Sequence, residues 1–293
     1  MNPLDLAFMQ RALIAALFVG LAAPSVGTYL VQRRLALMGD GIGHVALTGV
    51  ALGFLLQTTP VLTAVVTAAA GAVAIELVRE RGRTSGDVAL ALLFYGGIAG
   101  GVLLIGLAPG AGSATLLSYL FGSVTSVAPA DIAIIVALTA IVLLITLGMG
   151  RQLFAVAQDE EYARVCGLPV RAMNLLVAVT AAVTVTVAMR VVGLLLVSAL
   201  MVVPVATAQQ LTRGFRTTMA LALVLGVAAS LAGVMVSYYL DVAPGAAIVV
   251  LALAAFLAAS VVAAVRRSGR TPFGPAGGAP PAAEAGDDVT VPG

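Results

Sequence analysis

The chain has 293 residues, of which 61% are hydrophobic and only 10% are charged, and its mean hydropathy is +1.12. Soluble domains carry roughly 25% charged residues, so this composition excludes an ordinary soluble domain and indicates a membrane protein, while the net charge of +2 gives no reason to expect a nucleic acid as partner. Every basic residue is an arginine, which excludes a P-loop NTPase and a Schiff-base enzyme because both need a lysine, and the single cysteine, Cys166, excludes an intrachain disulfide.

Mostly apolar segments recur along the chain, and a helix needs roughly 20 such residues to cross a bilayer. We predict an all-α, polytopic membrane helix bundle of about eight to nine spans, which forms one transmembrane domain over residues 1–267. The tail over residues 268–293 is rich in proline, glycine and alanine, and we expect it to be disordered and cytoplasmic. The predicted spans are Phe8–Leu30, Leu35–Leu56, Pro60–Val78, Val88–Leu107, Ile132–Gly148, Ala172–Met189, Val191–Leu211, Thr217–Leu240 and Gly245–Val265.

Two places interrupt this series of spans. The segment Ser113–Ala128 is apolar but short and is followed by Pro129, so we predict a re-entrant or gate-like half-helix. Arg190 leaves almost no loop between the sixth and seventh spans, which predicts a broken pair of helices. We expect this arginine to form a structural ion pair with Asp131 or Asp241, and a role at an outer gate is the alternative.

The placement of the arginines predicts the orientation of the chain in the membrane. With alternating spans, nearly all of them fall on one side, which the positive-inside rule assigns to the cytoplasm. We therefore expect a multi-pass protein of the cell membrane with its N-terminus outside and its C-terminus in the cytoplasm. Only Arg11 and Arg190 lie elsewhere; the arginines that set the orientation are Arg33, Arg34, Arg79, Arg81, Arg83, Arg151, Arg164, Arg171, Arg213, Arg216, Arg266 and Arg267.

The only histidine, His44, lies in the second predicted span, four residues after Asp40. Positions i and i+4 share one helix face, and an ionisable residue inside a membrane segment indicates a functional site. An imidazole and a carboxylate are suitable ligands for a divalent transition metal. The pair therefore predicts movement of a metal ion through the membrane, and a two-fold dimer would bring together the four ligands that zinc prefers. The alternative is structural: His44 hydrogen-bonds a neighbouring helix, and Asp40 caps a group near the interface.

Two other acids flank the arginine-rich loop after the third span. Glu76 lies about one turn from the interface and could pair with Arg79 at i+3. Ser85 is a candidate N-cap of the fourth span, which puts Asp87 in its first turn, where the helix dipole favours an acid. We expect structural roles for both acids, and the alternative is that they are ligands on the ion path or at its cytoplasmic exit.

Small residues recur at the spacing that lets membrane helices approach each other closely. We expect these pairs to mediate helix packing; the alternative is a mobile second span, or a narrow path beside Asp40 and His44. The pairs are Gly39/Gly43 and Gly49/Gly53 in the second span, and Gly96/Gly100 and Gly97/Gly101 in the fourth.

Two polar segments on the predicted cytoplasmic side have the character of docking surfaces. Gln158–Pro169 is charged and amphipathic, which predicts a short helix ended by Gly167 and Pro169. Pro204–Arg216 leads from the seventh span into the cytoplasm. Two such surfaces favour a subunit that is driven by a cytoplasmic motor over a transporter that works alone.

Four stretches of the chain resemble the metal-ion family of ABC transporter permeases, the membrane subunits of zinc, manganese and iron(II) uptake systems. They are "FMQRALIAALFVGLAAPSVGTYLVQRRLALMGDGIGHVALTGVALGFLL", "SYLFGSV", "DEEYARVCGLPVRAMNLL" and "RVVGLLLVSALMVVPVATAQQLTRGF". The resemblance runs from about Phe8 to Val262. It implies a fold similar to the larger (type II) importers of cobalamin and siderophores, with a homodimeric permease over two cytoplasmic ATPase subunits. It also implies an extracytoplasmic binding protein that delivers the metal.

The same resemblance implies roles for individual residues. Asp40 and His44 coincide with the family's Asp-x-x-x-His pair, which is thought to lie along the ion path. The stretch "PVATAQQLTRGF" falls where the larger importers place the helix that couples to the ATPase. The coupling residues implied in this way are Val205, Ala206, Thr207, Gln209, Gln210, Arg213 and Arg216.

We therefore expect a non-catalytic permease subunit of an ATP-driven importer of a divalent transition metal. Zn²⁺ is the first candidate, Mn²⁺ and Fe²⁺ are the others, and no cofactor is permanently bound. The sequence offers no Ser/His/Asp arrangement, second histidine or Gly-rich phosphate loop for an enzyme. A permease for a metal chelate or a cobalamin-like substrate is the main alternative and predicts a wide cavity without convergent ligands. An ion-gradient-driven secondary transporter predicts inverted repeats instead, and an assembly protein is a third alternative.

Overall fold

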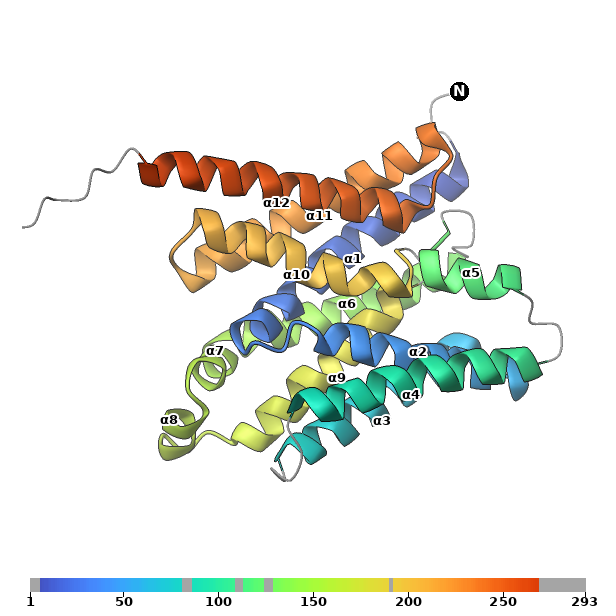
Figure 1. Ribbon diagram of the computed structural model, residues 1–293, viewed down its shortest axis with the longest axis horizontal. Coiled ribbons are helices and arrows are strands. Elements are labelled where there is room, and N and C mark those ends of the chain that lie inside the picture. Colours follow the sequence, from blue (N-terminus) through green and yellow to red (C-terminus); the bar gives the residue numbers. More distant parts are fainter. Residues whose placement is uncertain (1–5, 81–85, 109–112, 124–128, 190–191, 269–293) are drawn as a thin grey trace, which may run out of the picture.

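The computed structural model describes residues 6–80, 86–108, 113–123, 129–189 and 192–268, and over these ranges the chain consists of helices joined by short connections (Figure 1). The predicted all-α bundle is therefore confirmed. The helices are α1 (Ala7–Gln32), α2 (Met38–Leu55), α3 (Pro60–Glu80), α4 (Gly86–Leu107), α5 (Ser113–Phe121), α6 (Pro129–Gly148), α7 (Gly150–Gln158), α8 (Glu160–Val165), α9 (Val170–Ala188), α10 (Leu194–Leu211), α11 (Phe215–Leu240) and α12 (Pro244–Ser268).

Within the described ranges, eight helices are long and apolar enough to cross a membrane: α1, α2, α3, α4, α6, α9, α11 and α12. Helix α10 is also apolar, over Leu196–Leu211. Each of the nine predicted spans thus corresponds to one helix, and the predicted count of eight to nine agrees with the structure.

Helix α1 forms the centre of the bundle and packs against α6, α9, α10 and α11. In α1, 72% of the most apolar stretch is buried, compared with 17% in α12. Glycines allow the neighbours to approach this closely: a Cβ on Gly27 would collide with the Met201 backbone of α10, and a Cβ on Gly20 would lie 2.9 Å from the carbonyl oxygen of Gly226 on α11. The central helix therefore contacts its neighbours through backbone as well as side chains.

Helix α2 packs mainly against α3 and α4, and the contacts again involve glycines. A Cβ on Gly97 of α4 would lie 2.7 Å from the carbonyl carbon of His44, and a Cβ on Gly49 of α2 would lie 2.6 Å from the Cα of Ala64 on α3. Thr48 also donates a 2.8 Å hydrogen bond to the Gly97 carbonyl oxygen. The expected packing role of the small-residue pairs is borne out at these contacts but not at Gly96, where a Cβ would have nothing within 4 Å.

The connections at one end of the bundle are those that carry the arginines. Figure 1 shows the turn between α1 and α2, the turn between α10 and α11, helix α8 and the end of α12 at this end. The start of α1 and helix α5 lie at the opposite end. The arginine-rich connections thus share one side of the bundle, which agrees with the alternation of spans that the sequence predicts.

The two predicted interruptions of the spans correspond to real breaks. Helix α5 is a short helix, and the rest of the predicted half-helix, residues 124–128, lies outside the described residues. Helix α9 ends at Ala188 and α10 begins at Leu194. Gly193 has a φ of +89°, and a Cβ there would collide with the backbone of Phe121 and Gly122 at the end of α5. Arg190 lies outside the described residues, as do the tail residues 269–293.

The predicted amphipathic helix in the segment Gln158–Pro169 is present as α8. Asp159 caps it, because its carboxylate accepts a 2.9 Å hydrogen bond from the backbone N–H of Tyr162. Sequence reasoning missed α7, which follows α6 with only Met149 between them. This nine-residue helix is polar at both ends and apolar in the middle, and it is too short to be found by the length of a membrane span.

Candidate metal-ion site

Asp40 and His44 lie one turn apart near the start of α2, as predicted. The Oδ1 atom of Asp40 is 3.9 Å from Nε2 of His44, beyond hydrogen-bonding distance but close enough for both atoms to contact one ion. The His44 side chain is 5% exposed and the Asp40 side chain 30% exposed. The pair therefore consists of a buried imidazole next to a carboxylate that remains accessible.

The surroundings of His44 are apolar. Its ring meets the edge of Phe94 on α4, with the ring centroids 4.4 Å apart. The buried Nδ1 atom has no hydrogen-bond partner among the described residues. A buried polar atom without a partner typically destabilises a fold by about 1–3 kcal/mol. The hydrogen bond to a neighbouring helix that the structural alternative requires is therefore missing in the described part of the chain.

Asp40 faces α10. The hydroxyl of Ser198 donates a 3.4 Å hydrogen bond to Oδ1 of Asp40. Met201 lies one turn further along α10, where a Cβ on Gly39 would be 3.3 Å from its sulfur atom. Sequence reasoning missed Ser198, because 158 residues separate it from Asp40 and a lone serine in an apolar helix carries no signal of its own.

The described residues of one copy offer fewer ligands than a complete metal shell requires. Over the described residues, no group of three or more His, Cys, Asp or Glu side chains is close enough to hold one metal ion. Asp40 and His44 thus offer two candidate ligands, and the Ser198 hydroxyl or groups beyond the described residues would have to complete a coordination shell.

Glu76 is buried, and Arg79 neutralises it. The Arg79 guanidinium donates to both carboxylate oxygens, at 2.7 and 3.1 Å, which confirms the pairing expected at i+3. Glu76 and Arg79 also line a small cavity of about 130 Å³ together with Arg34, Met38 and Leu90. Glu76 therefore lies near the start of α2, but its charge is already satisfied.

Asp87 belongs to the first turn of α4, which begins at Gly86, so its predicted place in the helix is confirmed. The Asp87 side chain and Ser85, its expected neighbour at the N-cap, lie outside the described residues.

A cluster of polar side chains that the sequence did not predict ties α8 to three other helices. Glu160 on α8 accepts hydrogen bonds from Arg33 after α1, from Arg79 of α3 at 3.4 Å and from Asn174 of α9 at 3.3 Å. Burial raises the pKa of Glu160, but the positive charges of Arg33 and Arg79 and these hydrogen bonds lower it more, so its pKa is below the ordinary value. Burial lowers the pKa of Arg33, which its partner Glu160 partly offsets.

The predicted coupling residues divide between the interior and the surface. Val205 and Thr207 are buried, and Val205 packs in a small cluster with Ala208 of α10 and Ala222 of α11. The exposed members are Gln209, Arg213 and Arg216, whereas Ala206 and Gln210 are half-buried. Next to them is a cavity of about 320 Å³ lined by Gln32, Phe154, Gln158, Gln209, Thr212, Arg213, Phe215 and Thr218.

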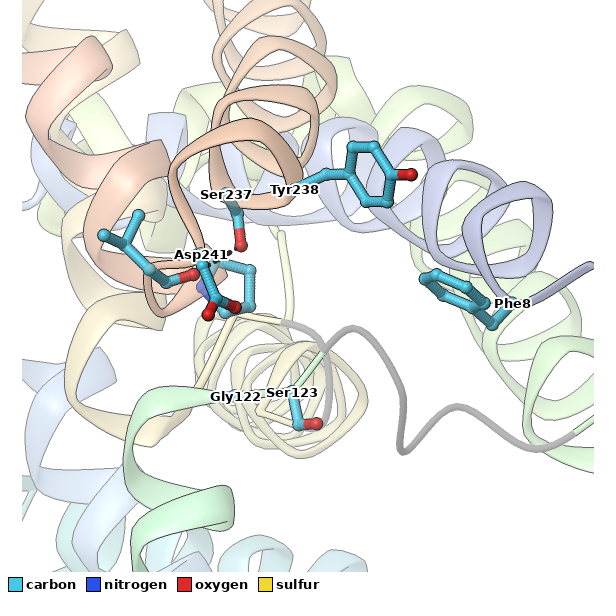
Figure 2. Close-up of a pocket in the computed structure, with 8 residues that line it drawn as sticks. Phe8, Gly122, Ser123, Ser237, Tyr238 and Asp241 are labelled. Carbon is cyan, nitrogen blue, oxygen red and sulfur yellow. Dashed lines mark hydrogen bonds between the residues drawn. The ribbon is translucent and has the colours of Figure 1, made fainter. Parts of the chain in front are cut away.

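A further cavity, of about 380 Å³, lies at the opposite end of the bundle. Figure 2 shows Ser237 and Asp241, from the end of α11, on one side of it and Phe8 of α1 on the other, with Ser123 from the connection after α5 between them. The Ser237 hydroxyl donates a 2.6 Å hydrogen bond to the Val242 carbonyl oxygen. Asp241 adopts the left-handed conformation, with a φ of +52°, and ends α11. The residues that line the cavity show that α1, α11 and the connection after α5 meet at this end of the bundle.

Comparisons with known proteins agree with this architecture. Residues 5–263 match the model of the ABC 3 transport family. Over 242 residues the chain is 35% identical to the "Probable metal transport system membrane protein" of Treponema pallidum, which covers 83% of this chain and 90% of that protein. It is 34% identical over 253 residues to the "Manganese transport system membrane protein MntC" of Halalkalibacterium halodurans, with 86% of each chain covered.

The fold is also similar to a solved structure, that of PsaBC from Streptococcus pneumoniae in complex with Fab. The TM-score is 0.80 and the sequence identity 32%, and the match covers 88% of this chain and 93% of that one. Because the family model extends over nearly all of the membrane bundle, the chain belongs to the ABC 3 transport family.

Proposed function

We propose that this chain is the non-catalytic permease subunit of an ATP-driven importer of a divalent transition-metal ion, and that Asp40 and His44 contact the ion on its way through the membrane. The observation that carries the proposal is the His44 imidazole, which is buried in a membrane helix and lies 3.9 Å from an accessible carboxylate, while its Nδ1 has no hydrogen-bond partner among the described residues. A two-residue site suits transport, because an ion held by a complete shell would leave slowly.

The chemistry of the pair allows several ions, and the names of the relatives favour one. Imidazole suits zinc, whereas carboxylate and hydroxyl oxygens suit manganese. Asp40 and Ser198 offer oxygen atoms next to the single imidazole, and the Halalkalibacterium halodurans relative is named as a manganese transport protein. We therefore place Mn²⁺ ahead of Zn²⁺, the first expectation from sequence, with Fe²⁺ as the remaining candidate.

In the assembly that we propose, the chain contacts a second copy of itself, an ATPase, a metal-binding protein and lipid. A second copy of the chain would supply another Asp40 and His44, and so a third and fourth ligand beyond the two that the described residues of one copy bring together. A cytoplasmic ABC ATPase would dock on the arginine-rich end, and an extracytoplasmic metal-binding protein on the end that carries α5 and the cavity of Figure 2. The lipid of the cell membrane would surround the spans, with the N-terminus outside and the C-terminus in the cytoplasm.

Helix α10 connects the proposed coupling surface to the metal site. Gln209, Gln210 and Arg213 lie at its end, and Arg216 follows in α11, whereas Ser198 lies earlier in α10 beside Asp40. The rise of 1.5 Å per residue places Gln209 about 16 Å from Ser198 along the helix. The buried members of the segment, Val205 and Thr207, and the half-buried Ala206 between them would carry motion into the bundle rather than touch the ATPase. ATP binding would in this way shift the groups around the ion.

Uptake in proteoliposomes tests the proposal. With a co-reconstituted ATPase and binding protein, His44→Ala and Asp40→Asn should each lower ATP-dependent Mn²⁺ uptake by about tenfold or more. Ser230→Ala is the matched control, because Ser230 is also buried without a hydrogen-bond partner but lies on α11. Expression and elution in gel filtration should be unchanged in all three. Uptake that persists in both site variants would refute the role of the pair, and uptake without ATP would favour a secondary transporter.

A further inference from the structure

A groove of about 900 Å³ lies at the arginine-rich end of the bundle, next to the end of α1. Its walls are the end of α6 with the start of α7 on one side and the start of α11 on the other. Both α6 and α11 pack against α1, but over the described residues they have at most marginal contact with each other. Tyr29 of α1 lines the groove between them, and its hydroxyl donates a 2.6 Å hydrogen bond to the Thr146 carbonyl oxygen.

The lining is apolar where the groove continues into the membrane. Leu147 on α6 and Met219 and Leu223 on α11 contribute to it. Leu147 is 54% exposed, and Leu144, one turn earlier on the same helix, is 74% exposed. In a bundle that crosses a bilayer, exposed leucines on a spanning helix face acyl chains, so the groove opens toward lipid as well as toward water.

Two arginines line the groove where it meets the polar end of the bundle. Arg151 follows α6 at the start of α7, and Arg216 is on the opposite wall at the start of α11. Both are exposed, and neither forms an ion pair with any carboxylate in the described part of the chain. Two unpaired guanidinium groups over an apolar trough match a ligand with a negative head and apolar tails.

We propose that this groove binds an anionic phospholipid, with its phosphate between Arg151 and Arg216 and its acyl chains against Leu147, Met219 and Leu223. Basic pockets between membrane helices on the cytoplasmic side bind anionic head groups in this way. The apolar wall favours a lipid over a soluble anion, which would leave that wall in water. The proposal does not depend on which ion the chain transports or on the role of Asp40 and His44.

The absence of tryptophan from the chain permits a direct test. Leu223→Trp places the only tryptophan in the groove, and Leu147→Trp places it on the opposite wall as a second reporter. Each variant is reconstituted in phosphatidylcholine vesicles that contain the same fraction of brominated phosphatidylglycerol or brominated phosphatidylcholine. Because bromine quenches tryptophan at contact, the phosphatidylglycerol should quench both reporters more strongly than the phosphatidylcholine does.

The arginines should account for this preference. Arg151→Gln and Arg216→Gln should each lower the relative affinity for phosphatidylglycerol by about fivefold, the effect expected for one basic residue near an anionic membrane surface. Arg213→Gln, an exposed arginine that lines a different cavity, should leave it unchanged. Ile141→Trp, exposed on α6 outside the groove, should be quenched equally by both lipids. Equal quenching at both groove reporters, or a preference that survives loss of both arginines, would overturn the proposal.

Discussion

Glu160 of α8 accepts a hydrogen bond from Arg33 at the end of α1, although 127 residues separate them in the chain. The Arg33 side chain is only 6% exposed, so its charge depends on this partner. Through Glu160, α8 is fastened to the central helix, whereas its outer residues Tyr162 and Val165 remain exposed. A short helix with an exposed face and a charged attachment to the bundle is suited to pass a partner's movement to α1.

This attachment predicts that stability depends on pH. Because the pKa of Glu160 is lowered in the folded chain, its stabilisation is present above the unfolded carboxyl pKa of about 4.3 and is lost as the pH falls through the lowered folded value. At pH 7, Glu160→Gln should therefore unfold more easily than wild type, by about 1 kcal/mol since the carboxylate is partly exposed. The difference in melting temperature between wild type and Glu160→Gln, measured in detergent, should be smaller at pH 3 to 4 than at pH 7. A difference in melting temperature that does not change with pH would contradict this account.

Close packing between α2 and α4 predicts that alanine substitutions at two neighbouring glycines of α4 change the stability of the fold differently. A Cβ on Gly97 would lie 2.7 Å from the His44 backbone, whereas a Cβ on Gly96 has nothing within 4 Å. We expect Gly97→Ala to destabilise the fold by about 1–3 kcal/mol because it pushes the two helices apart. Gly96→Ala should be neutral or slightly stabilising, since alanine is the better helix former. Melting temperatures of the two variants measure the difference, and equal values would be inconsistent with the contact.

The Tyr29 hydroxyl should contribute to stability through its hydrogen bond to the Thr146 carbonyl. Tyr29→Phe leaves that buried carbonyl oxygen near the end of α6 without the bond, which should lower the free energy of unfolding by about 1–2 kcal/mol. Tyr239→Phe is the control, because that side chain is 67% exposed and its loss of a hydroxyl should change little. Chemical unfolding in mixed micelles compares the two, and similar losses in both would show that the hydrogen bond is unimportant.

Ser198 should matter for the ion rather than for the fold. If it positions Asp40 or contacts the metal, Ser198→Ala should raise the Mn²⁺ concentration for half-maximal uptake by about two- to tenfold, the effect of one hydrogen bond, with little change in melting temperature. Ser198→Thr retains the hydroxyl and should restore most of the affinity. The measurement is initial uptake at a series of Mn²⁺ concentrations, and an alanine variant with wild-type affinity would remove Ser198 from the site.

The sequence predicted the parts of the structure that depend on local pattern. Hydrophobic segments of span length located the nine long helices of the described residues. The spacing of Asp40 and His44 placed them on one face, because helix geometry alone decides it. Sequence reasoning could not find Ser198 or the pairing of Arg33 with Glu160, since these depend on how distant helices pack. It also treated Val205 and Thr207 as part of a docking surface, whereas packing against α11 buries Val205. A span that is apolar on all sides gives no hint of which side will be covered.

The glycine at position 193 has a consequence for the whole transport cycle that we propose. The end of α5 rests directly on the start of α10, with no side chain between their backbones, and α10 ends at the turn that carries Arg213. Events at the end of α5 and at the turn after α10 thus act on opposite ends of one helix. In the assembly that we propose, coupling between these two ends must be reciprocal. If binding of the metal-loaded binding protein raises the affinity of the chain for the nucleotide-bound ATPase, binding of that ATPase raises the affinity for the binding protein by the same factor.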